Sequence, residues 1–318
     1  MDLIKRLAGD KKTKSDKKIM VIINPASNGF SPKKWVKIRE LFSQNNAEIS
    51  FSRIQGDATK VAAIAAKNKY HMVVACGGDG TMNEVLNGIV GTETALAVLP
   101  LGTGNVLAQE LGTPLDIEKA YRRIILGQII KCDVGVVKSV NSMERYFLCM
   151  AGVGGDAWVA ETISTEMKIK YGIWAYMKLV FAGLKNLKNL QFDAELNLNG
   201  GMCHKQTNIC LVMTGKATSH SSHNFQIGLQ NSLTNGKLNI LSINRIGLVA
   251  IARHLFHVLR GRRTYYQDLK YLGIHFEQRE TLTVNTVPIV GVQADGEYIG
   301  LSPAHFSVRQ HALKLVLP

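Results

Sequence analysis

Residues 73–88 read Val-Val-Ala-Cys-Gly-Gly-Asp-Gly-Thr-Met-Asn-Glu-Val-Leu-Asn-Gly, and this stretch decides the fold. An apolar run leads into a glycine-rich turn, and the Thr81-x-x-Glu84 pattern after it is a capping box, which predicts that a helix begins there. The stretch therefore predicts a strand, a tight turn and a helix N-terminus. Such an N-terminus presents unpaired N–H groups that bind phosphate, and glycines let the backbone approach a phosphate chain closely.

The turn also holds one carboxylate, that of Asp79. Beside a phosphate chain, this group could serve a Mg²⁺ ion or the hydroxyl that accepts a phosphoryl group. The plain alternative is a glycine turn with an Asp cap and no ligand. We favour phosphate binding, because Gly-Gly-Asp-Gly-Thr followed by Asn83 and Glu84 is much rarer than a simple glycine turn.

Strands and helices alternate around this stretch, which predicts a parallel sheet covered by helices. The predicted strands are 19–23, 48–53, 72–76 and 95–99, and the predicted helices are 31–45, 57–67, 81–89, 105–111 and 116–126. A second glycine run, 102–104, also follows a strand and precedes a helix. Because ligands bind at the carboxyl ends of parallel strands, both glycine runs are expected at one edge of the sheet.

After Gly127 the pattern changes to short strands with polar turns, over 129–153 and 192–244, which predicts a mostly antiparallel β domain. Two helical stretches, 173–187 and 248–260, interrupt it. The predicted division is a nucleotide-binding α/β domain over 18–127 and a β-rich domain over 128–304. Residues 1–17 are lysine-rich and predict a disordered basic tail, either a solvated leader or a membrane tether.

Composition limits the partners. The 318 residues carry a net charge of +14, which attracts polyanions. No nucleic-acid motif is present, so an anionic membrane is expected as the partner rather than nucleic acid. Five cysteines without a C-x-x-C pair predict neither a disulfide framework nor a zinc site, which indicates a cytoplasmic location. No apolar run reaches 18 residues, so peripheral membrane association is expected rather than a membrane span.

Four motifs, in order, resemble those of the diacylglycerol, sphingosine and ceramide kinase superfamily, in its soluble bacterial type. They are the 76–81 glycine run, Ile22–Gly29 with Asn24-Pro25, Leu99–Asn105, and Asp295-Gly296-Glu297. NAD kinases and phosphofructokinases are distant relatives. The resemblance implies an ATP-dependent kinase that uses Mg²⁺ and phosphorylates a hydroxyl of a diacylglycerol-like or sphingoid lipid. It also implies an active site in the cleft between the domains, with residues from about 305 to 318 returning to the first domain.

The resemblance further implies which residues form the site. Those expected to bind ATP are Asn24, Ser52, Gly77, Gly78, Asp79, Gly80, Thr81, Asn83, Glu84, Gly102 and Thr103. Glu297 and Asp79 are rival candidates for the general base, and the sequence does not decide between them. The flanking residues also make Asp295-Gly296 a hairpin turn, and Glu297 can belong to that turn and act as the base.

One departure concerns a structural Mg²⁺ that related enzymes hold in an Asp-Gly-x-Leu-Asp turn. Here residues 235–239 read Asn-Gly-Lys-Leu-Asn, so both carboxylates are amides. The matching ligands would be Asn235 and the carbonyls of Ser232 and Lys237, without carboxylate charge. A catalytically weak nucleotide- and lipid-binding protein of the same fold, or an NAD-kinase-type enzyme, therefore stays open beside the lipid kinase. The cluster Arg260, Arg262 and Arg263 is a candidate membrane contact, and a homodimer is a further candidate assembly.

Overall fold

The computed structural model describes residues 18–140, 142–162, 167, 191–198, 201–214, 225–226, 233–243, 264–265 and 274–317. The predicted tail at 1–17 and the predicted helices at 173–187 and 248–260 lie outside the described residues. So do Ser232 and the arginine cluster at 260–263.

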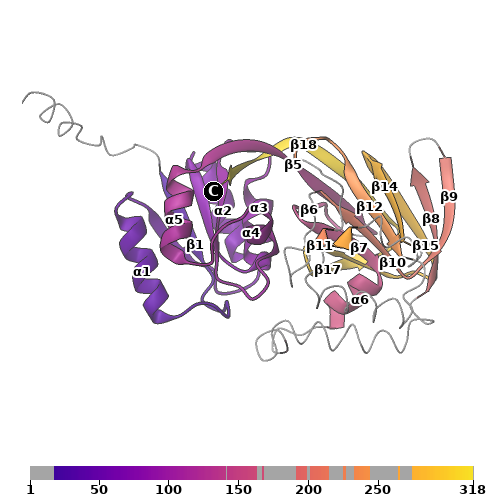
Figure 1. The fold of residues 1–318 in the computed structure, drawn as a ribbon, viewed down its shortest axis with the longest axis horizontal. Helices are drawn as coiled ribbons and strands as arrows, with labels where there is room; N and C mark the ends of the chain where they lie inside the picture. Colours follow the sequence, from indigo (N-terminus) through magenta and orange to yellow (C-terminus); the bar gives the residue numbers. More distant parts are fainter. Residues whose placement is uncertain are drawn as a thin grey trace, which may run out of the picture.

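The first half of the chain alternates strands and helices as predicted (Figure 1). Its elements are β1 (Ile19–Ile23), α1 (Pro32–Ser43), β2 (Glu48–Phe51), α2 (Asp57–Lys67), β3 (Met72–Gly77), α3 (Asp79–Ile89), β4 (Ala95–Pro100), α4 (Val106–Glu110) and α5 (Ile117–Leu126). The four strands are parallel, in the order β2-β1-β3-β4. Their carboxyl ends therefore meet at one edge, where both glycine loops lie.

Side chains of the buried strands alternate between two cores. In β3, Val73 and Ala75 pack towards α2 and α3, whereas Val74 and Cys76 pack towards α1 and α5. This period of two follows from strand geometry and lets one sheet carry helices on both faces. Helix α1 begins after Ser31, whose hydroxyl accepts the Lys34 N–H at 3.3 Å.

The predicted capping box is wrong. Helix α3 begins at Asp79, with an extended Gly78 as its N-cap residue, so Thr81 and Glu84 lie inside the helix. Gly78 turns the chain directly from β3 into α3, two residues earlier than the Thr81 pattern predicts. The Glu84 carboxylate reaches α2 instead and accepts the N–H groups of Gly56 and Ala58 at 3.0 Å each.

The second half is mostly antiparallel. Its elements are β5 (Gln128–Ser139), β6 (Arg145–Phe147), β7 (Met150–Gly154), α6 (Gly155–Thr162), β8 (Phe192–Leu198), β9 (Gly201–Thr207), β10 (Ile209–Met213), β11 (Phe225–Gln226), β12 (Leu238–Ile243), β13 (Thr264–Tyr265), β14 (Ile274–Arg279), β15 (Thr281–Val287), β16 (Gly291–Ala294), β17 (Glu297–Leu301) and β18 (Ala304–Leu317). One sheet runs β14-β12-β10-β7-β16-β17. It packs against the far part of the first sheet through a core that includes Phe147, Phe192 and Phe306.

Strands β5 and β18 connect the two halves. They pair antiparallel along nearly their whole length, with a change of register between Arg309 and Leu313. On one side of this break Lys314 pairs parallel with Ala95 of β4, and on the other Ser307 pairs with Thr281 of β15. The strand at 304–317 thus completes the parallel sheet of the first half. The predicted fold class, a parallel-sheet α/β half followed by an antiparallel β half, is confirmed.

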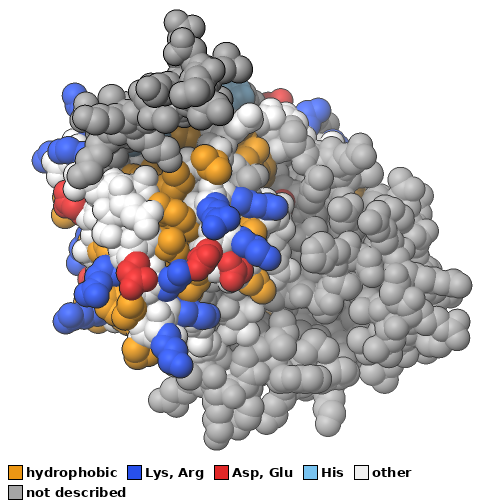
Figure 2. All heavy atoms as spheres, turned by 60° about the vertical axis from the view of Figure 1, so that its left-hand side comes forward, with side chains coloured by type: hydrophobic (Ala, Val, Ile, Leu, Met, Phe, Trp, Pro, Cys, Tyr) orange, Lys and Arg blue, Asp and Glu red, His pale blue; other side chains and the backbone are white. Residues whose placement is uncertain are grey.

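The surface over α1 and α5 is mixed in charge (Figure 2). Lysines and arginines lie there among acidic and apolar side chains, and Lys37 of α1 forms an ion pair with Glu118 of α5. The basic excess is therefore not gathered into one block on this face. Among the described residues, no helix combines the length and the apolar character that a membrane crossing requires.

Candidate active site

Two glycine loops lie against each other at the carboxyl edge of the parallel sheet. The first is Gly77–Gly80, between β3 and α3, and the second is Gly102–Gly104, between β4 and α4. A Cβ on Gly102 would overlap the Cα of Gly78 and lie 2.9 Å from Asn105 Oδ1, so only glycine allows this approach. Close backbones without side chains form a cradle of the kind that binds a phosphate chain.

The side-chain amide of Asn105, directly after the second loop, holds that loop in place. Asn105 accepts the Gly102 N–H through Oδ1 at 2.9 Å and donates through Nδ2 to the Gly102 carbonyl at 2.8 Å. Asn105 has a φ of 50°, in the left-handed region that asparagine tolerates better than most residues. These contacts fix the loop before any ligand binds.

Asp79 stands at the first position of α3. Its Oδ1 accepts the N–H of Leu107, at the start of α4, at 3.3 Å. The carboxylate thus links the helices that follow the two glycine loops. A negative charge at the start of a helix also interacts favourably with the helix dipole.

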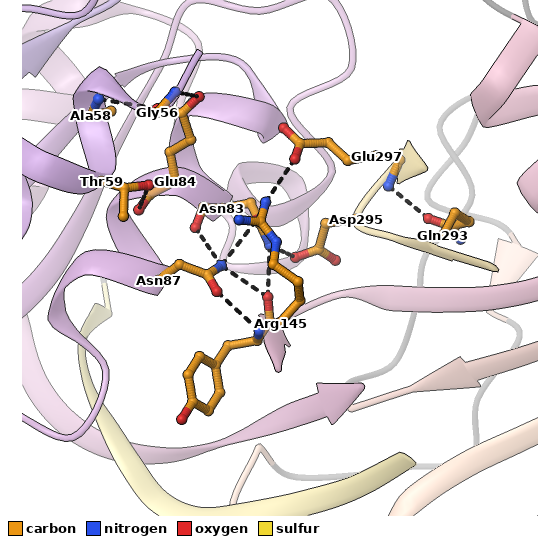
Figure 3. Close-up of polar contacts among 12 residues, drawn as sticks. Gly56, Ala58, Thr59, Asn83, Glu84, Asn87, Arg145, Gln293, Asp295 and Glu297 are labelled. Carbon is orange, nitrogen blue, oxygen red and sulfur yellow. Dashed lines mark hydrogen bonds and ion pairs between the residues drawn. The ribbon is translucent and has the colours of Figure 1, made fainter. Parts of the chain in front are cut away.

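Glu297 reaches the same first turn of α3 from the other half of the chain (Figure 3). It begins β17, directly after the Asp295-Gly296 turn that joins β16 to β17, so the predicted hairpin is confirmed. Its Oε1 would lie 3.6 Å from a Cβ on Gly80. The two candidate bases therefore come from different halves of the chain: Asp79 is the first residue of α3, and Glu297 approaches Gly80, the second.

Asp295 anchors this hairpin rather than facing the loops. Its carboxylate accepts the backbone N–H groups of Leu148, Cys149 and Met150 at 2.9 to 3.0 Å and the Asn83 amide at 2.8 Å. Desolvation raises the pKa of Asp295, and these four donors oppose that effect. The hairpin that carries Glu297 is thus fastened to the link between β6 and β7, to the start of β7 and to α3.

A second contact supports the same hairpin. Gln293 accepts the Gly296 N–H through Oε1 at 2.8 Å and donates through Nε2 to Asp156 of α6. Desolvation raises the pKa of Asp156 to about 6, and the Gln293 bond opposes this. The turn between β16 and β17 is therefore held at Asp295 and at Gly296.

Several predicted nucleotide-binding residues lie around the two loops. Asn24, after β1, donates to Thr81 Oγ1 at 3.1 Å, and Thr103 Oγ1 accepts from Asn28 at 2.8 Å. These bonds tie the loop after β1 to both glycine loops. Ser52 lies one strand farther out, after β2; it is 5% exposed and its N–H donates to the Ile23 carbonyl at 2.8 Å.

Two other predicted residues point away from the loops. The Glu84 carboxylate caps the start of α2, and Thr59 donates to the Glu84 carbonyl at 2.9 Å. Asn83 donates to the Tyr146 carbonyl at 3.0 Å and to Asp295. Both side chains therefore make internal contacts of the protein (Figure 3).

In the described part of the 235–239 turn, the side-chain oxygens of both asparagines accept hydrogen bonds within the protein. Asn235 Oδ1 accepts the Lys237 N–H at 3.1 Å, and Asn239 Oδ1 accepts from Gln278 at 2.9 Å. The nearby carboxylate of Asp133 accepts the N–H groups of Gly236 at 2.7 Å and His311 at 2.9 Å. Within the described ranges no three or more His, Cys, Asp or Glu side chains gather as metal ligands.

Arg145 and Gln293 contact the predicted site, but sequence reasoning missed them. Arg145 Nη2 lies 2.7 Å from Glu297 Oε2. Neither residue belongs to a motif, and their roles depend on pairing between distant strands. The only signal for Gln293 is its position two residues before the Asp-Gly turn.

Known proteins resemble the whole chain. A family model of the diacylglycerol kinase catalytic domain matches residues 18–137. A diacylglycerol kinase of Bacillus subtilis (strain 168) is 28% identical over 310 residues, which cover 95% of this chain and 97% of that protein. A diacylglycerol kinase of Staphylococcus carnosus (strain TM300) is 27% identical and covers 93% of this chain and 94% of its own.

Solved structures agree on the fold. The crystal structure of a diacylglycerol kinase from Bacillus anthracis str. Sterne superposes with a TM-score of 0.70 at 19% identity, over 95% of this chain and 97% of that chain. A second structure from the same organism gives a TM-score of 0.75 at 22% identity, over 98% of both chains. The catalytic-domain match includes the two stacked glycine loops, and the full-length relatives also cover the hairpin that brings Glu297 to them. Residues 18–137 thus match the diacylglycerol kinase catalytic domain, and nearly the whole chain is similar to bacterial diacylglycerol kinases.

Proposed function

We propose that this chain is an ATP-dependent lipid kinase that phosphorylates a hydroxyl of a diacylglycerol-like or sphingoid lipid. One observation carries the proposal: the two glycine loops approach each other as closely as only glycine permits, and Asp79 and Glu297 both lie near the start of α3 beside them. Backbone N–H groups suit the phosphates of a nucleotide, and a carboxylate suits the proton of an acceptor hydroxyl.

The reaction needs one proton acceptor and neutralisation of the phosphoryl oxygens. Glu297 or Asp79 takes the proton of the lipid hydroxyl as its oxygen forms a bond to the γ-phosphorus, and the bond to the ADP leaving group breaks. The N–H groups of the glycine loops bind the phosphate oxygens on which charge develops. Mg²⁺ bound with the nucleotide would neutralise further phosphate charge, and Asp79 is the described carboxylate best situated to hold it.

A lipid acceptor implies that the enzyme meets its substrate at a membrane surface. We expect peripheral association with the inner face of an anionic membrane, because the net charge of +14 favours such a surface. Arg260, Arg262 and Arg263 stay the candidate contact. A homodimer stays a candidate assembly.

The test is phosphate transfer from radiolabelled Mg-ATP to a panel of dispersed diacylglycerol, sphingosine and ceramide, with NAD alongside. We expect a labelled lipid and no labelled NAD. Asp79→Asn and Glu297→Gln should each reduce turnover by about 10² to 10⁴, as expected for a positioned acid–base group. Glu297→Gln should leave the dissociation constant of ATP nearly unchanged, because Glu297 faces the acceptor.

The other outcomes separate the alternatives. ATP binding without transfer to any acceptor would support the catalytically weak binding protein. Labelled NAD would indicate the NAD-kinase type. A selective loss of ATP affinity in Glu297→Gln would move Glu297 from the acceptor to the nucleotide.

A further inference from the structure

Arg145 lies between the two halves of the candidate site. It begins the short strand β6, which pairs with β5 and lies beside α3. Its Nη2 is 2.7 Å from Glu297 Oε2 and 3.4 Å from Asn83 Oδ1 (Figure 3). One guanidinium therefore contacts both the hairpin that carries Glu297 and the helix that follows the first glycine loop.

The surroundings hold Arg145 in place. The Tyr146 N–H donates to Asn87 Oδ1 at 3.0 Å, and the Tyr146 carbonyl accepts from Asn83 and Asn87, each at 3.0 Å. Asn87 also donates to the Asn83 side chain at 3.0 Å. These bonds fasten β6 to two successive turns of α3, so the backbone that carries Arg145 is held in place.

The Arg145–Glu297 ion pair is suited to orientation. The side chains are 31% and 22% exposed, so water partly screens their attraction, and such pairs contribute little to stability. The guanidinium contacts Oε2, whereas Oε1 is the oxygen nearest Gly80. The arginine thereby turns one carboxylate oxygen towards the start of α3, where the glycine loops meet. Small displacements of a reacting group can cost about a hundredfold in rate.

We propose that Arg145 is a positioning residue that holds the Glu297 carboxylate towards the glycine loops. The proposal rests on the proposed function, in which Glu297 is the base. Two rival roles exist for this arginine: direct binding of the ATP phosphates, and a purely structural contact between β6 and α3.

The test compares Arg145→Ala, Arg145→Lys and Arg145→Ala/Glu297→Gln with the parent and with Glu297→Gln alone. Arg309→Ala is the matched control, because Arg309 donates to the Tyr146 hydroxyl at 2.7 Å and has no contact with Glu297 among the described interactions. The parent must first transfer phosphate to lipid. An inactive parent would refute the proposed function and this inference with it.

In an active parent, we expect Arg145→Ala to lower kcat about ten- to hundredfold with KM for ATP changed less than about threefold. Arg145→Lys should recover part of kcat, as should free guanidinium added to Arg145→Ala. Arg309→Ala should behave like the parent. The decisive result is the double variant, which should be no slower than Glu297→Gln alone, because residues that act as a unit are not additive.

Three results would overturn the inference. These are an Arg145→Ala enzyme with parental kcat, a rise in KM for ATP that accounts for the loss, and a double variant slower than Glu297→Gln by the full Arg145→Ala factor. The last two would assign Arg145 to the nucleotide. If Arg145→Ala does not fold, Arg145→Lys with and without Glu297→Gln gives the same comparison.

Discussion

Replacing Glu84 should destabilise the protein and leave nucleotide binding intact. Its carboxylate is the cap of α2, with two 3.0 Å bonds from backbone N–H groups, and the residue is 9% exposed. A hydrogen bond to a charged group contributes about 1.5–3 kcal/mol, and loss of a helix cap costs about 0.5–2 kcal/mol. Because both bonds serve one helix end, we expect Glu84→Ala to lower the free energy of unfolding by about 3 kcal/mol.

At about 2–4 °C per kcal/mol, that loss lowers Tm by roughly 6–12 °C. Glu84→Gln keeps an acceptor oxygen and should lose about half as much. The assays are thermal unfolding and ATP titration on the same samples. Glu118→Gln is the control, because it removes a carboxylate paired on the surface with Lys37, where such pairs contribute about 0–1 kcal/mol.

The refuting result is specific. If Glu84→Gln unfolds at the parental temperature but binds ATP more weakly, the carboxylate serves the nucleotide and the capping argument fails. The parental dissociation constant together with a lowered Tm supports the cap.

Two further predictions concern a glycine and a buried carboxylate. Gly102→Ala should weaken ATP binding about tenfold or more, because the added Cβ would push the two glycine loops apart. Gly88→Ala is the control: its Cβ would lie 2.5 Å from the Thr59 carbonyl in α2, so it should lower Tm and leave ATP binding unchanged. Equal losses of ATP binding in both variants would contradict a role for the close approach of the loops. Asp156 has its pKa raised from 3.8 to about 6, so the folded state favours its protonated form, and the free energy of unfolding of the parent should lose up to about 3 kcal/mol as pH rises from about 4 to 6. In denaturant titrations, the free energy of unfolding of Asp156→Asn should depend less on pH over that range. An unchanged slope in this variant would mean that other groups cause the pH dependence.

Much of the first half was predictable from sequence because its signals are local. Buried strands such as 72–76 are continuous apolar runs, and the Ser31-Pro32 pair begins a helix where it is found. The capping box failed for a local reason: Thr81 and Glu84 have the right spacing, but the extended Gly78 already begins the helix. The sequence does not reveal that the Glu84 partner lies on α2, because that contact depends on how two helices pack.

The candidate site was predictable from the sequence only in part. The glycine loops, Asp79 and Glu297 belong to motifs, and a motif can be read without knowing its neighbours. Asn83 lies in the same motif, yet its amide serves Asp295 and Tyr146, because α3 turns that side of the helix towards the second half. Arg145 carries no signal in the sequence: a single arginine in a three-residue strand gains meaning only when β6 and β17 are brought together.

The pairing of Lys314 with Ala95 has a consequence for biosynthesis. During translation, β1 to β4 leave the ribosome long before β18, so the parallel sheet keeps one edge of β4 unpaired until the residues after 304 have been made. Contacts between such distant segments form slowly, since a long loop must close before they stabilise anything. The parallel sheet of the first half is therefore completed only by β18, and the hairpin that carries Glu297 is made just before that strand.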